Sequence, residues 1–504
     1  MITNLTQYLD RQMENRPKKI ALQAGEERLS FEDVFNCAKN IAAKINIGCE
    51  GIVNSPIIIF CEKGIIEYIS LLGVLYSGNY YVPLDVKMPE ERINMILDCL
   101  NAKVVITEEK YVGCLKRLGF LGKYLILDKW EDLNYVTHEK LEGRNSIIDC
   151  DPAYILFTSG STGVPKGVVI SHRAVIDYIE WQCDTLKFDE DVVLGNQAPF
   201  YFDASMPDIY TPLVCGATLD IIPEMLFVFP NKLIEYINKQ KINVLIWVPS
   251  ALITITSKDY FAENLIEGLR MVMFCGEIMP NKHLNVWRRY YPETKFVNLY
   301  GPTEAAYACT YYEVNRKFED DEILPIGRPC GNTGIMVLDE SNHLVYSGEG
   351  ELCIRGTCLS NGYYRNRDKT KEVFVENPLN SVYYDLIYRT GDIVRYNEFG
   401  ELEYIGRKDF QIKHMGYRIE LGEIEMAAYG LRQMNMCCAI YDDERRKILL
   451  YCVVNEVISP KEIYAALKEK IPKYMLPAEI IIKEKLPLNA NGKVDRASLR
   501  GKSK

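Results

Sequence analysis

The sequence lacks the features that mark membrane and secreted proteins. None of its apolar runs approaches the roughly 18 residues that a membrane-spanning helix needs. The most apolar short run, IVNSPIIIF at 52–60, is interrupted by Asn54 and Pro56. The opening residues, MITNLTQYLDRQMENRPKK, contain no apolar signal core. We therefore expect a cytoplasmic protein that does not insert into a membrane.

The sequence also lacks the charge balance of a nucleic-acid binder and the cysteine spacing of a metal site. It has 59 Lys and Arg residues against 69 Asp and Glu residues, a formal charge of −10, which excludes binding to nucleic acid by bulk attraction. Its 16 cysteines are scattered without a CxxC pair, and its five histidines do not cluster beside them. Reduced, mostly buried thiols are the expectation.

A chain of 504 residues is too long for one ordinary core, so at least two domains are expected. Between about 150 and 310, short apolar runs alternate with helix-length segments, which predicts a parallel sheet flanked by helices. The predicted strands are AYILFT (153–158), VLIWVP (244–249), MVMFC (271–275) and KFVNLY (295–300). A helix after residue 171 is predicted to have Ser171 as its N-cap. Ligands bind at the carboxyl ends of such strands, where the loops TSGSTG, CGE and GPTE begin.

After about residue 320 the strands become shorter and turn residues denser, which predicts a β-rich subdomain. The last hundred residues predict a small mixed unit, with strands at 448–454 and 479–487 and a helix at 461–472. The polar stretch GRKDFQIK (406–413) is suited to a hinge. The predicted fold class is thus α/β, with a large domain at 1–408, which contains the β-rich subdomain, and a small, mobile α+β domain at 409–504.

The stretch FTSGSTGVPKGV at 157–168 raises the question of a phosphate loop. It is not a Walker A loop, because Lys166 is not followed by Ser or Thr in a Gly-Lys-Ser/Thr sequence. Successive backbone N–H groups, hydroxyl side chains and one lysine can nevertheless converge on phosphate oxygens. By its residues alone the stretch fits a phosphate cradle and an ordinary Gly- and Ser-rich turn about equally.

Other motifs decide between these alternatives. They follow in order as FDAS (202–205), NLYGPTEA (298–305), GELCIRG (350–356), YRTGDIV (388–394), GRKDFQIKHMGYRIELGEIE (406–425) and PLNANGKVDR (487–496). Together with the loop they resemble the signatures of the adenylate-forming superfamily, which contains acyl-CoA synthetases, luciferases and the adenylation domains of peptide synthetases. The resemblance covers almost the whole chain. It implies an ATP-dependent ligase that joins a carboxylate to AMP, releases pyrophosphate and passes the acyl group to a thiol.

The resemblance also implies which residues bind ATP and Mg²⁺. Glu304 matches the Mg²⁺ ligand, Tyr300 the aromatic residue that stacks on adenine, and Asp392 the acceptor for the ribose hydroxyls. Lys166 adds positive charge at the β- and γ-phosphates. The remaining ATP-binding positions are Thr158, Ser159, Gly160, Ser161, Thr162, Gly163, Asn298, Leu299, Gly301, Pro302, Thr303, Tyr404 and Arg407.

Lys493 is the central catalytic prediction. In this motif it resembles the lysine that bridges the substrate carboxylate and the α-phosphate and stabilises charge in the adenylation transition state. Family members then rotate the small domain to form a second active site. Asp409 matches the hinge of that rotation, and Gly416 matches the position where the pantetheine arm passes close to backbone.

Asp203 indicates the substrate class. In amino-acid-activating members, an Asp at this position pairs with the substrate ammonium group, which fatty and aryl acids lack. The walls of the substrate pocket are predicted by motif position to include Ala204, Met206, Pro207, Trp247, Cys275, Leu299, Tyr307 and Ala308. Asp203 and Lys493 complete the predicted substrate-binding residues. Trp247 and Tyr307 are bulky, which favours a substrate with a small side chain. Either ring could also turn away from the pocket or stack on the substrate.

The stretches FCGEIMP (274–280) and DIYTPLVCGATL (208–219) look particularly like those of D-alanine–D-alanyl carrier protein ligases, which act in teichoic acid modification. D-alanine is therefore the predicted substrate, with another small amino acid of a peptide synthetase as the alternative. No pantetheine attachment motif is found, so a separate phosphopantetheinylated carrier protein is expected as acceptor, with free CoA as the second candidate. A monomer is expected. A nucleotide-binding regulator without catalysis is disfavoured by the presence of both Glu304 and Lys493.

Overall fold

A computed structural model describes residues 1–48, 52–135, 142–160, 163–258, 260–443, 445–487 and 494–500. The chain divides into two units. The first comprises residues 1–86, 102–156 and 167–408, and the second comprises residues 87–101, 157–166 and 409–504. The predicted α/β architecture is confirmed, and each unit is described separately below.

The first unit is built on two parallel sheets and one antiparallel sheet. In the nine-stranded sheet, six neighbouring strands are parallel, and β2, β14 and β15 pair antiparallel at its two edges. Its strands, in spatial order, are β15 (Arg328–Pro329), β14 (Thr310–Glu313), β13 (Lys295–Tyr300), β12 (Met271–Phe274), β11 (Val244–Trp247), β9 (Val193–Asn196), β10 (Thr218–Ile221), β1 (Ile20–Ala24) and β2 (Glu27–Ser30).

The second sheet has six strands, and the third is antiparallel and matches the predicted β-rich subdomain. The six-stranded sheet consists of β6 (Lys123–Ile126), β5 (Val104–Thr107), β3 (Pro56–Phe60), β4 (Tyr80–Pro83), β7 (Pro152–Thr158) and β8 (Lys166–Ser171). The third consists of β16 (Thr333–Leu338), β17 (Glu349–Gly356), β19 (Leu386–Tyr396), β18 (Phe374–Glu376) and β20 (Leu402–Arg407).

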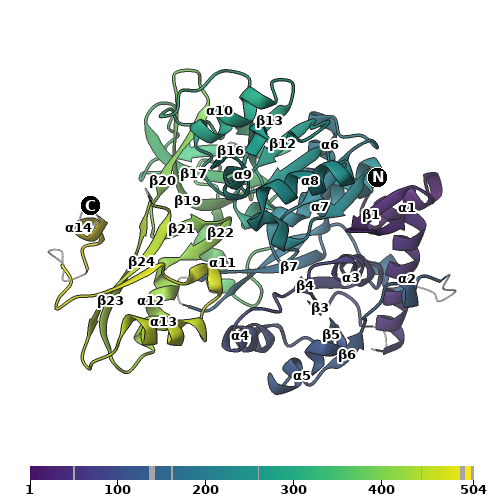
Figure 1. Ribbon diagram of the computed structural model, residues 1–504, viewed down its shortest axis with the longest axis horizontal. Coiled ribbons are helices and arrows are strands. Elements are labelled where there is room, and N and C mark those ends of the chain that lie inside the picture. The colour runs from purple at the N-terminus through teal and green to yellow at the C-terminus, as the bar shows by residue number, and fades with distance from the viewer. Residues whose placement is uncertain are drawn as a thin grey trace. The chain divides into compact units, whose positions relative to one another are not determined.

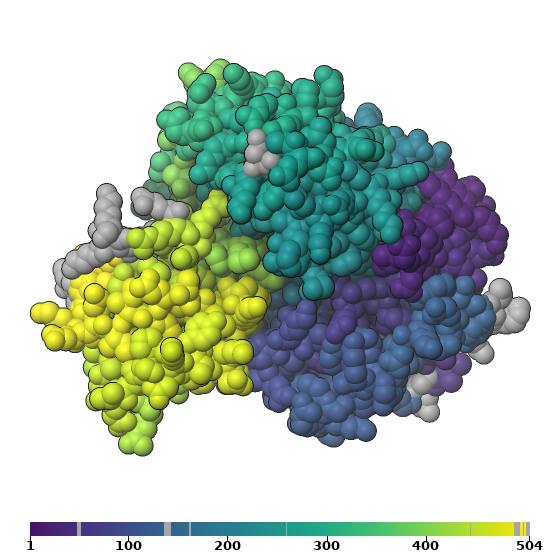
Figure 2. Space-filling view, in the orientation of Figure 1, coloured from purple at the N-terminus to yellow at the C-terminus, as the bar shows by residue number. Residues whose placement is uncertain are grey.

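Helices cover the parallel sheets, and α3 packs against β3 and β4 (Figure 1). In the space-filling view, the teal residues, which include α8 to α10, lie together on this face of the first unit (Figure 2). The predicted N-cap is confirmed, since the Ser171 hydroxyl accepts a hydrogen bond from the Ala174 amide. The helices of this unit are α1 (Thr6–Asn15), α2 (Phe31–Gly48), α3 (Ile65–Tyr76), α5 (Glu109–Arg117), α6 (His172–Leu186), α7 (Met206–Cys215), α8 (Pro230–Gln240), α9 (Pro249–Thr256), α10 (Asn281–Tyr290) and α11 (Arg367–Val373).

The second unit contains a hairpin, a three-stranded sheet and helices. Helix α13 begins with a capping box, because the side chains of Ser459 and Glu462 each accept a hydrogen bond from the other's backbone amide. The elements are α4 (Glu90–Leu100), β21 (Gln411–His414), β22 (Tyr417–Glu420), α12 (Leu421–Tyr429), β23 (Met434–Asp442), β24 (Lys447–Val454), α13 (Pro460–Lys468), β25 (Glu479–Ile482) and α14 (Arg496–Arg500).

A polar cluster lies inside the first unit, at the base of the loop that joins β9 to α7. The Lys63 ammonium donates hydrogen bonds to the carbonyls of Gln197 (3.0 Å) and Asn196 (3.4 Å). The Asn196 amide donates in turn to the Asp208 carboxylate at 2.7 Å. Burial raises the pKa values of Asp208 and of nearby Glu67 to about 8 each, and it lowers the pKa of Lys63 to about 8.

We expect Glu67→Gln to flatten the dependence of stability on pH. The pKa of Glu67 is raised from 4.5 to about 8 on folding. The native state therefore holds a proton that the unfolded state loses, and stability falls as pH rises from about 4.5 to about 8. One such proton corresponds to roughly 1.4 kcal/mol per pH unit. Calorimetric unfolding of both proteins between pH 5 and 8 measures the slope, with the exposed Glu14→Gln as the control. Equal slopes of stability against pH for the wild type, Glu67→Gln and Glu14→Gln would contradict this role of Glu67.

Candidate active site

The FDAS motif places its carboxylate at the start of a helix. Asp203 begins a single 3-10 turn (Asp203–Ser205) that leads directly into α7, and it is partly exposed. Its Oδ2 accepts a hydrogen bond from the Thr303 hydroxyl. Thr303 belongs to the GPTE loop after β13, so two motifs separated by 100 residues meet at the carboxyl edge of the nine-stranded sheet.

The pocket walls follow the alternation of the central strands. Cys275 and Leu299 belong to the same buried cluster as Tyr307 and Ala308, and Ala204 packs against that cluster. Successive residues of a strand face opposite sides of a sheet, so on β11 it is Ile246 that shares this side. The structure thus brings together Asp203, Ala204, Cys275, Leu299, Tyr307 and Ala308 in the first unit, with Met206 in the same buried cluster.

Trp247 is not among the residues brought together there. Its ring lies in the cluster on the opposite face of the sheet, where it contacts the ring of Phe227 edge-on with 5.1 Å between centroids. Its indole N–H donates to the Gly195 carbonyl at 2.8 Å, which satisfies the only polar atom of this buried side chain. The Trp247 ring therefore does not narrow the space predicted for the substrate, because that space lies on the other face of the sheet.

Tyr307 has an unusual backbone conformation. Its φ is +88° and that of Ala306 is +50°, a region that side-chain-bearing residues rarely adopt. The buried Tyr307 ring meets the edge of the Tyr178 ring from α6 at 5.7 Å and 88°. Burial raises the pKa of the Tyr307 phenol far above its usual value, and the nearby charge of Asp203 acts in the same direction. The phenol is therefore neutral.

Glu304 is suited to holding a cation. It lies in a second 3-10 turn (Thr303–Ala305), is completely buried, and its Oε1 accepts a hydrogen bond from the Tyr363 hydroxyl at 2.7 Å. Mg²⁺ commonly takes one or two protein carboxylates and completes its shell with phosphate oxygens and water. A buried carboxylate at the edge of the sheet fits that donor set. In the described part of the chain, no three His, Cys, Asp or Glu side chains gather closely enough to form a metal site by themselves.

The predicted ribose site contains a shared carboxylate. Asp392 on β19 accepts a hydrogen bond from the Tyr300 hydroxyl at one oxygen and from the Arg407 guanidinium at the other, at 2.7 Å in the latter case. An ionised carboxylate offers about four acceptor sites, so two remain for ribose hydroxyls. Tyr404 lies beside Tyr300, with 6.2 Å between ring centroids. Asn298 points away, since its amide donates to the Pro325 carbonyl.

The loop from Thr158 to Lys166 belongs to the second unit. At Gly160, a Cβ atom would lie 2.0 Å from the Val164 carbonyl oxygen, and Gly163 has a φ of +77°, so this turn requires both glycines. The Ser159 hydroxyl donates to the Arg418 carbonyl at 2.7 Å, and Lys166 is buried with its ammonium 3.9 Å from the Glu420 carboxylate. Ser161, Thr162 and the catalytic candidate Lys493 lie outside the described residues.

The hinge and hairpin candidates lie in the second unit. The Asp409 carboxylate accepts a hydrogen bond from the Gln411 amide at 3.1 Å. Gly416, with a φ of +81°, follows Met415, with a φ of +54°, in the two-residue turn between β21 and β22. Two successive positive φ angles are typical of the type I′ turn of a hairpin.

Three residues at the site were not predicted from the sequence. They are Ile246 and Tyr178, which line or support the pocket face, and Tyr363, which binds Glu304. The strand period of two in VLIW could have identified Ile246 as the neighbour of Cys275 in place of Trp247. Tyr178 and Tyr363 give no comparable local signal, because their roles arise from contacts with distant segments.

Two family models match the chain. The AMP-binding enzyme model matches residues 9–364, and the AMP-binding enzyme C-terminal domain model matches residues 423–493. They confirm the predicted membership of the adenylate-forming superfamily. The chain therefore belongs to the AMP-binding enzyme family. The closer resemblance to D-alanine ligases is not confirmed.

The chain is similar to parts of much longer peptide synthases. It is 33% identical to bacitracin synthase 1 of Bacillus licheniformis over 500 residues, which cover 98% of this chain and 9% of that protein. It is 30% identical to tyrocidine synthase 1 of Brevibacillus parabrevis, covering 98% of this chain and 45% of the relative. The chain thus spans less than half the length of both of these relatives.

Solved structures share the fold. The Vibrio cholerae adenylation domain AlmE, in complex with glycyl-adenosine-5'-phosphate, matches with a TM-score of 0.86 at 20% identity, covering 99% of this chain and 98% of that one. An NRPS protein containing adenylation and PCP domains matches with a TM-score of 0.82 at 24% identity, covering 98% and 84%. Among the helices in the described ranges, none has both the length and the apolar composition needed to cross a lipid bilayer.

We expect the neighbours Trp247 and Ile246 to differ in their effect on substrate choice. Trp247→Phe removes the hydrogen bond to Gly195 and should lower stability by about 1 kcal/mol while the order of preferred acids stays unchanged. Ile246→Ala should instead admit larger side chains. Rates of ATP–pyrophosphate exchange with a panel of amino acids measure both effects. A changed order for Trp247→Phe with an unchanged order for Ile246→Ala would contradict the assignment of the two faces.

Proposed function

We propose that this protein activates a small amino acid as its aminoacyl adenylate and then transfers it to the phosphopantetheine thiol of a carrier protein. The observation that carries this proposal is the partly exposed Asp203 carboxylate, which accepts a hydrogen bond from the Thr303 hydroxyl at the carboxyl edge of the nine-stranded sheet. A carboxylate at that place offers a charged partner to a substrate ammonium group. Fatty and aryl acids have no ammonium group that could pair with this carboxylate.

In the first half-reaction, a carboxylate oxygen of the amino acid attacks the α-phosphorus of ATP. The bond from that phosphorus to the bridging oxygen breaks, and pyrophosphate leaves with the electron pair. Asp203 holds the ammonium group, and Asp392 accepts hydrogen bonds from the ribose. Glu304 would hold Mg²⁺, which supplies charge neutralisation at the phosphates. The lysine of the family motif, Lys493, stabilises the negative charge that develops between the two reacting groups.

In the second half-reaction, the carrier thiolate attacks the acyl carbonyl carbon and AMP leaves, so the product is an aminoacyl thioester. We propose residues 1–408 and 409–504 as the functional domains. Rotation at Asp409 withdraws Lys493 and admits the pantetheine arm past Gly416. The loop from Thr158 to Lys166, including Ser161 and Thr162, would hold the departing pyrophosphate.

Two small amino-acid substrates are compatible with this proposal. In this proposal, the buried side chains of Cys275, Leu299 and Tyr307 favour a substrate with a small side chain, such as D-alanine. The peptide synthases among the relatives support the alternative, another small amino acid destined for a peptide. Glycine, L-alanine, D-alanine and L-serine therefore form the first panel to test, with loaded carrier protein as the second readout and CoA as the competing acceptor.

We expect Asp203→Asn to lower amino-acid-dependent ATP–pyrophosphate exchange by at least about a hundredfold. Removing the charge of a paired, partly buried group typically costs several kcal/mol. The loss should appear in kcat/KM for the amino acid, with the KM for ATP little changed. Thr303→Val, which removes only the orienting hydroxyl, should give a smaller loss in the same direction. Full exchange by Asp203→Asn, or preference of the wild-type protein for an acid without an amino group, would contradict the proposal.

A further inference from the structure

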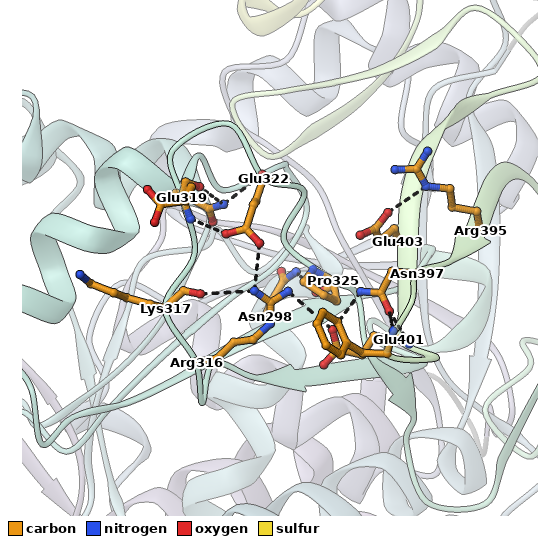
Figure 3. A network of polar contacts seen from close by, with 12 residues as sticks. Asn298, Arg316, Lys317, Glu319, Glu322, Pro325, Arg395, Asn397, Glu401 and Glu403 are labelled. Carbon is orange, nitrogen blue, oxygen red and sulfur yellow. Dashed lines mark hydrogen bonds and ion pairs between the residues drawn. The ribbon is translucent and has the colours of Figure 1, made fainter.

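Arg316 lies at the centre of a polar network in the segment that joins β14 to β15 (Figure 3). Its guanidinium lies over the Phe318 ring, 3.7 Å from the centroid, and 5.2 Å from the centroid of Phe399. The same group forms an ion pair with Glu322 at 3.0 Å and approaches Glu401 at 3.9 Å. The planar guanidinium thus contacts two rings and two carboxylates at once, which an ammonium group cannot do.

One side of this network is fixed to the nine-stranded sheet and to α10. The Arg288 guanidinium donates to the Arg316 carbonyl at 2.6 Å, and the Asn281 amide donates to two carbonyls of the same segment at 3.0 Å each. At the end of the segment, the Asn298 amide donates to the Pro325 carbonyl at 2.8 Å. Asn298 is two residues before Tyr300 on β13, so the segment is fastened to the strand that carries that phenol.

The other side of the network is the turn between β19 and β20. The Asn397 amide donates to the Glu401 carboxylate at 3.0 Å, and its side-chain oxygen accepts from the backbone amides of Phe399 and Glu401. Next to the turn, the Ile326 amide donates to the Leu402 carbonyl at 2.7 Å. The turn that presents Phe399 and Glu401 to Arg316 is therefore held by its own hydrogen bonds.

These two strands carry the predicted ribose site. Asp392 lies on β19 and Arg407 on β20, and the two residues are paired across the strands. Tyr300, which binds the same carboxylate, lies on β13 of the other sheet. The position of Asp392 relative to Tyr300 thus depends on how the β19–β20 hairpin is fastened to the nine-stranded sheet. Arg316 is a side chain that touches both the segment fixed to β13 and the turn of the hairpin.

We propose that Arg316 is a positioning residue for nucleotide recognition: by joining Glu322 and Phe318 to Glu401 and Phe399, it sets the place of Asp392 at the ribose. This inference rests on the proposed function, in which Asp392 reads the ribose hydroxyls. Partly exposed ion pairs contribute little to stability, so the expected effect of Arg316 is on geometry more than on folding. Catalysis is sensitive to displacements of about 1 Å in such supports.

The test compares ATP with 2′-deoxyATP and 3′-deoxyATP in pyrophosphate exchange with the best amino acid. The wild-type protein should prefer ATP. Arg316→Met should lower the ratio of kcat/KM for ATP to that for the deoxynucleotides by roughly tenfold, the equivalent of one hydrogen bond. The KM for the amino acid should stay within about twofold, because Asp203 is held by separate contacts. Arg316→Lys should restore the ratio only in part.

Matched variants separate the possible outcomes. Arg270→Met removes an exposed, two-bond ion pair with Asp189 in the same unit and should leave the ratio unchanged. Glu401→Gln, a milder change at the hairpin, should shift the ratio in the same direction as Arg316→Met. If Asp392→Asn abolishes the discrimination while the Arg316 and Glu401 variants keep it, the inference is overturned and the proposed function survives. If the wild-type protein exchanges with no amino acid, the proposed function fails and the inference fails with it.

Discussion

The Asp392 carboxylate, held between the Tyr300 hydroxyl and the Arg407 guanidinium, joins the antiparallel sheet to the nine-stranded parallel sheet. All three side chains are largely withdrawn from water, where an unpaired charge would be costly. Each oxygen of the carboxylate accepts one of these hydrogen bonds. The same carboxylate keeps acceptor sites for further hydrogen bonds, so one interaction both joins the two sheets and prepares the proposed ribose site.

A parallel architecture explains why residues so far apart in the sequence can act together. FDAS lies after β9, the CGE loop after β12 and the GPTE loop after β13, and these strands run parallel in one sheet, with β11 between β9 and β12. Their carboxyl ends meet at one edge, where Thr303 binds Asp203 and Tyr363 binds Glu304. The anionic groups proposed for substrate and metal are therefore oriented by neutral hydroxyl donors, which leave their charge available for a substrate ammonium group and a cation.

Much of the fold was predictable because it depends on local pattern. The strands at β7, β11, β12 and β13 and the Ser171 cap follow from apolar runs and from one hydroxyl at a helix start. The site residues of the motifs came from the resemblance to a family. By contrast, the position of Trp247 was uncertain, because a bulky side chain at a strand end can take either face. Strand alternation and one hydrogen bond to Gly195 place it opposite the pocket.

Other features had no local signal at all. The positive φ of Tyr307 arises from the packing of its loop, and the roles of Tyr178 and Tyr363 require segments more than 50 residues away. The Arg316 network likewise combines three segments whose side chains look like ordinary surface charges in the sequence. Such long-range contacts decide geometry, and they become visible only in the folded chain.

In the proposed function, Asp203 selects acids that carry an ammonium group. The most direct test of this selection is calorimetric titration of the wild-type protein with two non-hydrolysable adenylate analogues, alanyl sulfamoyl adenosine and the propionyl compound that lacks only the amino group. Because the two ligands share every other contact, the difference in Kd isolates the ammonium–carboxylate pair. We expect the alanyl compound to bind at least about a hundredfold more tightly than the propionyl compound, which corresponds to roughly 2.7 kcal/mol. Equal affinities would contradict it.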